Sequence, residues 1–191
     1  MPPLSEIAGG LYGAWRLARL DPAGLKYFNT TVDGFWRSFF AAILVAPLVI
    51  ALFYVRYSDG DLFASPLRIA AIETVAYVMA WVAFPVVMVG LSRTLDRENR
   101  YITYIVAYNW ASVWQNLVFL PIAILIEIGM ITGSFAGTLS LVLMVVVLSY
   151  TWVVTRYALD VTGGVAAMLV AVDLVLSFAV NFAADVMLRL S

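Results

Sequence analysis

Histidine and cysteine are both absent from this chain of 191 residues, and lysine occurs only as Lys26. Their absence excludes histidine-ligated haem, iron–sulfur clusters, zinc sites built on these residues, and thiol or Ser-His-Asp catalysis. Disulfides and lipid anchors on cysteine are excluded as well. The chain also has no phosphate-binding loop, dinucleotide fingerprint or hydrolase nucleophile elbow. We therefore expect no cofactor, no bound metal and no enzymatic activity.

Charged residues are scarce too. They make up only 12% of the chain, the net charge is −1, and 64% of the residues are hydrophobic. Soluble domains average roughly 25% charged and 45–50% apolar residues. There is no basic patch, so we expect no nucleic-acid partner. Several apolar runs reach the roughly 20 residues that cross a bilayer core of about 30 Å. This pattern predicts an integral membrane protein in contact with the lipid bilayer.

The apolar runs predict an all-α bundle of five transmembrane helices over residues 35–191, preceded by a short amphipathic segment over residues 1–34. The predicted spans are residues 35–54, 67–91, 101–127, 136–157 and 161–188. An alternative places 101–116 in the membrane interface and leaves four spans. Only roughly 15 apolar residues would then remain before the next glycines, fewer than the usual 17–25. We therefore favour five spans.

Turn residues mark two of the predicted connections. Ser58-Asp59-Gly60 follows the first span, and Gly129, Gly133 and Gly137 follow the third. Glycine, serine and aspartate in such clusters are typical of turns. No linker or low-complexity stretch divides the chain, so we expect one membrane domain.

The amphipathic segment contains a predicted helix. Ile7, Leu11, Trp15 and Ala18 recur at helical spacing, and Asp21-Pro22 then ends the helix because proline cannot continue it. Such a helix fits the lipid headgroup region, and a loosely ordered tail fits the sequence equally well. We expect no removable signal peptide, since no short apolar core precedes a small-residue cleavage site.

The distribution of lysine and arginine predicts the orientation. One side of the predicted topology carries eight of these residues: Arg16, Arg19, Lys26, Arg37, Arg93, Arg97, Arg100 and Arg156. The other side carries three, namely Arg56, Arg68 and Arg189. Positive residues favour the cytoplasmic side of a membrane. We therefore expect a cytoplasmic N-terminus and an extracytoplasmic C-terminus, in a bacterial inner membrane.

The third span carries the largest set of polar side chains. On a helix that turns 100° per residue, Asn109, Ser112, Asn116 and Glu127 share one stripe. We expect this stripe to face protein rather than lipid. Pro121 lies between these groups and is expected to kink the helix, because it leaves the carbonyl of Leu117 without its hydrogen bond.

The fifth span contains Asp173, with Ser177 and Asn181 following at four-residue steps. A charged side chain in mid-membrane costs about 2.5–3.5 kcal/mol on insertion scales, so it needs a reason. One hypothesis is a proton or cation site supported by Ser177, Asn181 and amides of the third span. The other is a protonated Asp173 that joins two helices through Asn109 or Asn116. We favour the second, because transporters usually show more central charges and a broken helix.

The loop before the third span, RTLDRENR, alternates Arg93, Arg97 and Arg100 with Asp96 and Glu98. The three arginines are candidates for binding anionic lipid or a partner protein. A solvated loop whose charges pair with one another is the alternative.

Five spans, a cytoplasmic lead-in and this charged loop before an aromatic third span resemble, over residues 30–190, the Yip-type family of Rab-interacting membrane proteins and its bacterial relatives. The resemblance implies a non-catalytic membrane adaptor, and it assigns no functional residue. We expect a scaffold or accessory subunit that binds other membrane proteins or itself. The alternative is a small ion- or proton-coupled transporter using Asp173, with Glu127 and Asn109 as helpers.

Overall fold

A computed structural model describes residues 1–58 and 65–189, and these residues contain helices and no strand. The α-helices are α1 (Leu4–Ala18), α2 (Val32–Ser38), α3 (Phe40–Tyr57), α4 (Pro66–Thr94), α5 (Tyr101–Glu127), α6 (Gly133–Leu159) and α7 (Gly163–Arg189). Two short 3-10 helices, η1 (Pro22–Tyr27) and η2 (Glu98–Arg100), precede α2 and α5.

In the described part of the chain, five helical segments are long and apolar enough to cross a membrane: Val32–Tyr57, Pro66–Thr94, Glu98–Glu127, Gly133–Leu159 and Gly163–Arg189. The predicted all-α bundle of five membrane-spanning helices is therefore confirmed. In the four-span alternative the third span would break near residue 116, but α5 is one helix of 27 residues, with Pro121 inside it.

The structure corrects two predicted boundaries. The first span begins near residue 32 rather than 35, because the Thr31 hydroxyl accepts a hydrogen bond from Gly34 N at 3.1 Å and starts α2. Gly137 lies within α6 and not in the preceding turn. That turn is formed around Gly129 and Gly133, whose φ angles of 75° and 65° favour glycine. The predicted residues 59 and 60 of the earlier turn lie outside the described part of the chain.

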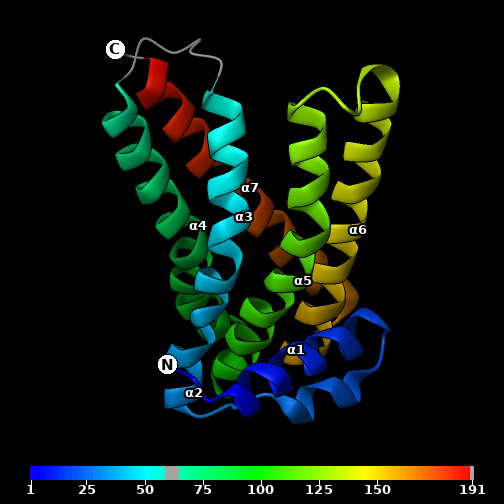
Figure 1. Ribbon diagram of the computed structural model, residues 1–191. Coiled ribbons are helices and arrows are strands. Elements are labelled where there is room, and N and C mark those ends of the chain that lie inside the picture. The colour runs from blue at the N-terminus through cyan, green and yellow to red at the C-terminus, as the bar shows by residue number, and fades with distance from the viewer. Residues whose placement is uncertain (59–64, 190–191) are drawn as a thin grey trace.

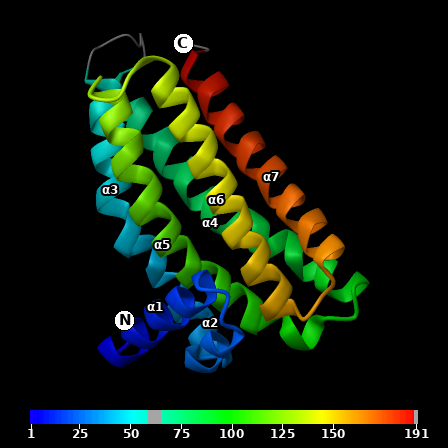
Figure 2. The ribbon, with the colours of Figure 1, turned by 90° about the vertical axis from the view of Figure 1, so that its right-hand side faces the viewer.

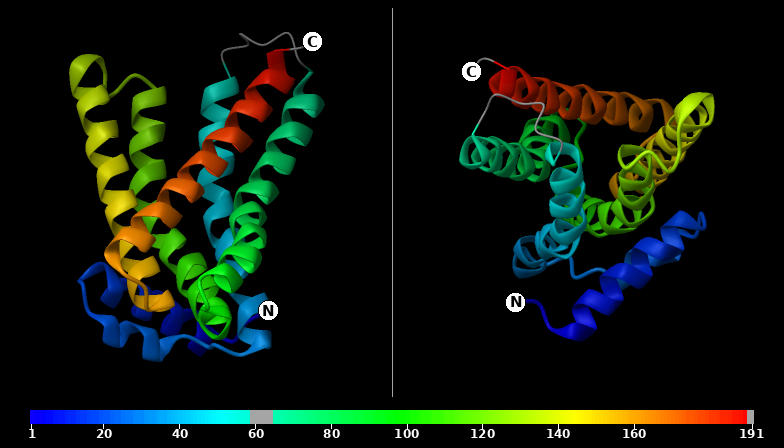
Figure 3. Two further views of the ribbon diagram at one scale, coloured as in Figure 1. Left: turned by 180° about the vertical axis from the view of Figure 1, so that it is seen from behind. Right: turned by 45° about the horizontal axis from the view of Figure 1, so that its top comes forward.

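The two ends of the bundle differ in Figure 1. One end, called the α1 end below, carries α1 and α2 together with the α4–α5 and α6–α7 connections. The opposite end, called the far end, holds the end of α3, the start of α4, the α5–α6 turn and the end of α7. Toward the far end the helices separate into two arms, α5 with α6 and α3 with α4 and α7 (Figure 3). Helix α7 crosses from the α1 end of α6 to the far end of α4 (Figures 2 and 3).

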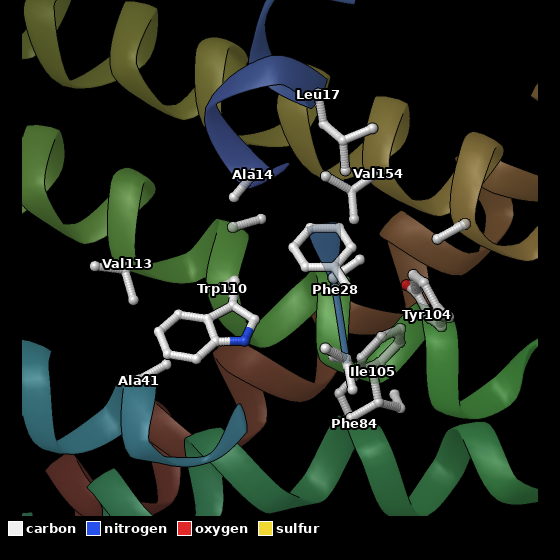
Figure 4. Packing of buried hydrophobic residues seen from close by; sticks show 14 of the residues in the cluster. Ala14, Leu17, Phe28, Ala41, Phe84, Tyr104, Ile105, Trp110, Val113 and Val154 are labelled. Atoms are coloured by element: carbon white, nitrogen blue, oxygen red, sulfur yellow. The ribbon is translucent and has the colours of Figure 1, made fainter. Parts of the chain in front are cut away.

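Helix α5 is the centre of the packing, since it contacts α1, α2, α3, α4 and α6. Its buried residues run without interruption from Tyr104 to Val113 apart from the half-buried Tyr108, and toward the far end only Leu120 is buried. The buried side chains of Figure 4 lie around this part of α5, with Trp110 and Tyr104 among the largest.

Helix α1 is ordered and docks on α5 and α6, so the loosely ordered alternative does not apply. Its buried face consists of Gly10, Gly13, Ala14 and Leu17. The predicted apolar stripe shares in this docking only in part, since Ile7 and Leu11 pack against the core whereas Trp15 is 45% exposed. The physical reason is close approach: a Cβ atom on Gly10 would lie 2.5 Å from the Trp110 ring, so only glycine fits there. Small residues make the closest contacts of this helix, and the partly exposed Trp15 ring packs on the Trp114 ring of α5 at a centroid distance of 5.3 Å.

Candidate functional site

A hydrogen-bonded core surrounds the half of α5 at the α1 end. Three consecutive contacts tie α5 to three other helices. Tyr104 Oη lies 3.0 Å from Thr155 Oγ1 of α6, and Tyr108 Oη donates to Asp173 of α7. Asn109 Nδ2 donates to Ser38 Oγ of α2 over 2.9 Å. Buried polar groups need such partners, because an unsatisfied one costs about 1–3 kcal/mol.

Asp173 accepts hydrogen bonds from the Tyr108 hydroxyl at both carboxylate oxygens, over 3.0 and 3.1 Å. The Tyr108 ring in turn packs on Phe84 at a centroid distance of 5.1 Å. Within the described residues, no lysine or arginine forms an ion pair with Asp173. The Asp173 carboxylate therefore joins α7 to α5 through the Tyr108 hydroxyl, and the Tyr108 ring is supported by Phe84.

The structure does not bring the expected amides to Asp173. Asn109 is fully buried and faces Ser38, and its Oδ1 atom is a buried acceptor without a partner among the described residues. Asn116 donates to the Ser112 carbonyl on its own helix, at 2.8 Å. Ser112 likewise donates to the Tyr108 carbonyl, at 2.9 Å. The partner that sequence reasoning missed is Tyr108.

Ser177 and Asn181 are exposed, unlike the half-buried Asp173. Asn181 Nδ2 donates to the Ser177 carbonyl over 2.8 Å. Each four-residue step rotates the side chain by about 40° around the helix, so this stripe of α7 winds away from the packed side. The predicted stripe therefore has two parts. Asp173 belongs to the hydrogen-bonded core, whereas Ser177 and Asn181, called the exposed polar stripe below, lie outside it.

Glu127 lies at the far end, where its Oε1 atom is 2.6 Å from Arg56 Nε of α3. This ion pair joins α3 to α5 and lies far along the helix from the core. In the neighbouring α4, Glu73 accepts a hydrogen bond from the Tyr57 hydroxyl. Sequence reasoning noted Glu127 but did not find its partner, because Arg56 comes from another helix.

The arginines of the charged loop serve contacts within the protein. Arg93 Nε lies 3.7 Å from Glu98 Oε1, and Arg97 Nε donates to the Asp160 carbonyl at 3.1 Å. Arg97 thereby ties the loop to the turn between α6 and α7. Arg100 is exposed. These contacts agree with the self-paired interpretation for Arg93 and leave Arg100 accessible.

A second charged contact fixes the segment after α1. Arg16 Nε donates to Asp21 Oδ2 over 2.7 Å, and the Asp21 Oδ1 atom accepts from Ala23 N at 3.0 Å. The hydrogen bond from Arg16 is the main reason that the pKa of Asp21 lies below its ordinary value. The Arg16 guanidinium also lies over the Tyr27 ring, at 5.5 Å.

No group of three or more acidic residues able to hold a metal ion is found in the described ranges 1–58 and 65–189. The fold and its core define a polytopic α-helical membrane protein whose helices are joined by tyrosine, asparagine and aspartate side chains. No family model, no curated protein and no solved structure matches the chain.

Proposed function

We propose that this protein is a non-enzymatic membrane scaffold, an accessory subunit that holds another membrane protein through the exposed polar stripe of α7. This proposal rests on the positions of Ser177 and Asn181. Both are exposed on a helix of 27 residues, or about 40 Å. Ser177 lies near the middle of that length, inside the roughly 30 Å of hydrocarbon.

An amide in hydrocarbon requires a hydrogen-bond partner, because lipid chains provide none. The only partner that the described residues offer the Asn181 side chain is the Ser177 carbonyl, which binds one amide hydrogen. The Asn181 carbonyl oxygen and second amide hydrogen remain available. Serine and asparagine side chains join transmembrane helices through bonds of about 0.6–2 kcal/mol each. A helix of a partner protein satisfies these groups.

The core supports this role by fixing α7. The Tyr108–Asp173 contact anchors α7 to α5 just before the exposed polar stripe begins. At the far end, Arg68 Nη2 donates to the Met187 carbonyl over 2.8 Å and ties α7 to α4. A helix held at both places presents its exposed face in a defined position, which lowers the entropic cost of binding.

The proposal includes location and orientation. Eight lysine and arginine residues on the α1 side against three on the other support a cytoplasmic α1 end, and we place the protein in a bacterial inner membrane. The resemblance to Yip-type proteins supports an adaptor rather than an enzyme.

Site-directed cross-linking tests the scaffold. Because the chain has no cysteine, Ser177→Cys carries a single thiol-reactive photocross-linker in native membranes. The matched control is Val175→Cys, 66% exposed on the opposite side of α7. We expect Ser177→Cys to form a discrete protein adduct and Val175→Cys to form none.

A loss-of-binding variant completes the test. The partner protein that is cross-linked by Ser177→Cys should also co-purify with the wild-type chain, without cross-linker, at a fixed ratio in mild detergent. Asn181→Leu should reduce that ratio at least several-fold, and Val175→Leu should not. Equal adducts from positions 175 and 177, or co-purification that Asn181→Leu leaves unchanged, would overturn the proposal.

One observation favours a second function, a small proton- or cation-coupled transporter. Asp173 is a membrane carboxylate whose hydrogen bonds, within the described residues, come from a single hydroxyl, that of Tyr108. Intramembrane carboxylates mark proton and cation pathways in transporters. In proteoliposomes, Asp173→Asn should abolish flux while leaving assembly intact if this function applies. Unchanged cellular function and expression of Asp173→Asn would exclude it.

A further inference from the structure

A groove of about 600 Å³ lies between α3 and α4 toward the far end. This volume is within the roughly 300–1,000 Å³ of small-molecule sites. Its walls are aliphatic and aromatic side chains of the two helices, among them Phe53, Tyr54 and Tyr77. Tyr54 is 78% exposed, so the groove opens to the surrounding membrane.

The groove has the depth of one leaflet. It follows α3 from Ala46 to Ser58 and α4 from Pro66 to Tyr77. At 1.5 Å per residue these stretches measure roughly 16–18 Å, close to half of the about 30 Å hydrocarbon core. The Tyr77 hydroxyl donates to the Ala42 carbonyl over 2.6 Å and closes the groove toward the middle of the bundle.

Glu73 is the charged residue in the lining of this groove. Its Oε1 atom accepts from the Tyr57 hydroxyl, and no lysine or arginine pairs with it among residues 1–58 and 65–189. The nearby Arg56 is engaged by Glu127. A carboxylate accepts about four hydrogen bonds, so Glu73 can receive a cation beside Tyr57.

The length of α4 places the Glu73 carboxylate near the boundary between the hydrocarbon and the lipid head groups. Helix α4 has 29 residues, or about 43 Å, so each end extends about 6–7 Å beyond the hydrocarbon. Glu73 lies seven residues after Pro66, or about 10 Å along the axis. Helical side chains lean toward the N-terminus, and this brings the Glu73 carboxylate to the hydrocarbon boundary.

We propose that this groove binds one phospholipid with a primary ammonium head group, drawn from the leaflet at the far end. An acyl chain lies between α3 and α4, and the ammonium binds Glu73 with Tyr54 and Tyr57 alongside. Tyrosine faces attract cations. A partner helix, about 10 Å across with its side chains, does not fit, because the Tyr57–Glu73 and Tyr77–Ala42 hydrogen bonds cross the groove.

Native mass spectrometry measures retained lipid directly. The purified protein is equilibrated with equal amounts of phosphatidylethanolamine and phosphatidylglycerol in mild detergent. The first variant is Glu73→Gln, which keeps the acceptor for Tyr57 and removes the charge. Asp185→Asn is the matched control, because it removes one exposed carboxylate of the same end. Ala70→Trp fills the groove independently of charge.

The wild-type chain should retain one phosphatidylethanolamine in preference to phosphatidylglycerol. Glu73→Gln should reduce this preference about fivefold, the upper range for a partly exposed ion pair, and Asp185→Asn should preserve it. Ala70→Trp should lose both lipids while remaining monodisperse. No retained lipid in the wild type, equal retention of both lipids, or an unchanged preference in Glu73→Gln would overturn the proposal. If Ala70→Trp fails to fold, the comparison of Glu73→Gln with Asp185→Asn decides alone.

Discussion

The two ends of this bundle are held together by different means. At the α1 end, the side chains of α5 reach four other helices: Tyr104 bonds α6, Tyr108 bonds α7, Asn109 bonds α2 and Trp114 Nε1 donates to the Leu11 carbonyl of α1 at 2.9 Å. At the far end, the Arg56–Glu127 ion pair connects the two arms. Within one arm, the Tyr57 hydroxyl of α3 donates to Glu73 of α4, and Arg68 of α4 donates to the Met187 carbonyl of α7.

This difference shows which contacts select one arrangement of helices in a membrane protein. Apolar contact cannot distinguish a neighbouring helix from lipid, since both are equally apolar. Hydrogen bonds and close contacts through glycine can distinguish a neighbouring helix from lipid. The end rich in such contacts is held in one packing arrangement, whereas the helices of the far end expose apolar side chains such as Phe135 and Met187. We infer that the α1 end fixes the fold and that the looser far end has room for the lipid proposed above.

The largest expected effect is at the glycine contact of the α1 end. Gly10→Leu places side-chain atoms in the Trp110 ring, and overpacking of this kind costs typically about 1–3 kcal/mol. We expect a loss of stability toward 3 kcal/mol and protease cleavage within residues 4–27. Gly137→Leu is the control, because nothing lies within 4 Å of its Cβ position. Equal stability of the two variants would contradict the docking of α1.

Next in size is the contact between α5 and α7. Tyr108→Phe leaves Asp173 without its hydroxyl donor, and an unsatisfied buried polar group costs about 1–3 kcal/mol. We expect a destabilisation of about 2 kcal/mol, measured by reversible unfolding in mixed micelles. Tyr157→Phe should cost far less, because its hydroxyl has no hydrogen-bond partner in the described part of the chain. Similar losses of stability in both variants would show that the hydrogen bond from Tyr108 to Asp173 does not stabilise the fold.

The ion pair of the far end should matter less. Arg56→Gln removes a partly exposed pair with Glu127, and exposed pairs contribute about 0.2–1 kcal/mol. The same unfolding measurement should give less than about 1 kcal/mol. Glu127→Gln and the double variant should each lose as much stability as Arg56→Gln, because any one of these changes already removes the whole ion pair. A loss as large as that of Tyr108→Phe would remove the distinction between the ends.

The smallest effect is a pH dependence. The folded chain holds the pKa of Asp21 below its ordinary value of 3.8, chiefly through the hydrogen bond from Arg16. A lowered carboxyl pKa stabilises the fold above the ordinary value, and this contribution is lost as the pH falls through the folded pKa. Pepsin cleavage near residues 19–27 should therefore increase below about pH 4. Asp21→Asn, compared at each pH, should lack this change; an identical profile in both would contradict it.

The sequence predicted the membrane-spanning helices well, because hydrocarbon thickness dictates their length. The predicted 101–127 has the bounds of α5, and the other spans differ by a few residues at their ends. Thr31 and Gly137 mark the differences: one caps a helix earlier than the apolar run begins, and the other is a helical glycine at a lipid-exposed position.

The core was less predictable, because its contacts join residues far apart in the chain. Asp173 was identified as a central residue, but its partner Tyr108 lies 65 positions away. Tyrosine in a membrane sequence usually indicates an interfacial anchor, so nothing marked this hydroxyl as a donor. The docking face of α1 was missed for a related reason, since Gly10 and Gly13 contribute no apolar periodicity.

Distances between pairs of spin labels test the contrast between the two ends most directly. The absence of native cysteine allows one labelled pair at the α1 end, Ala18→Cys with Arg93→Cys, and one across the arms at the far end, Ala71→Cys with Thr138→Cys. All four positions are exposed. In lipid nanodiscs, we predict a narrow distance distribution for the first pair and a broader one for the second, since weakly packed regions open more readily. Equal widths, or a broader distribution at the α1 end, would contradict the account.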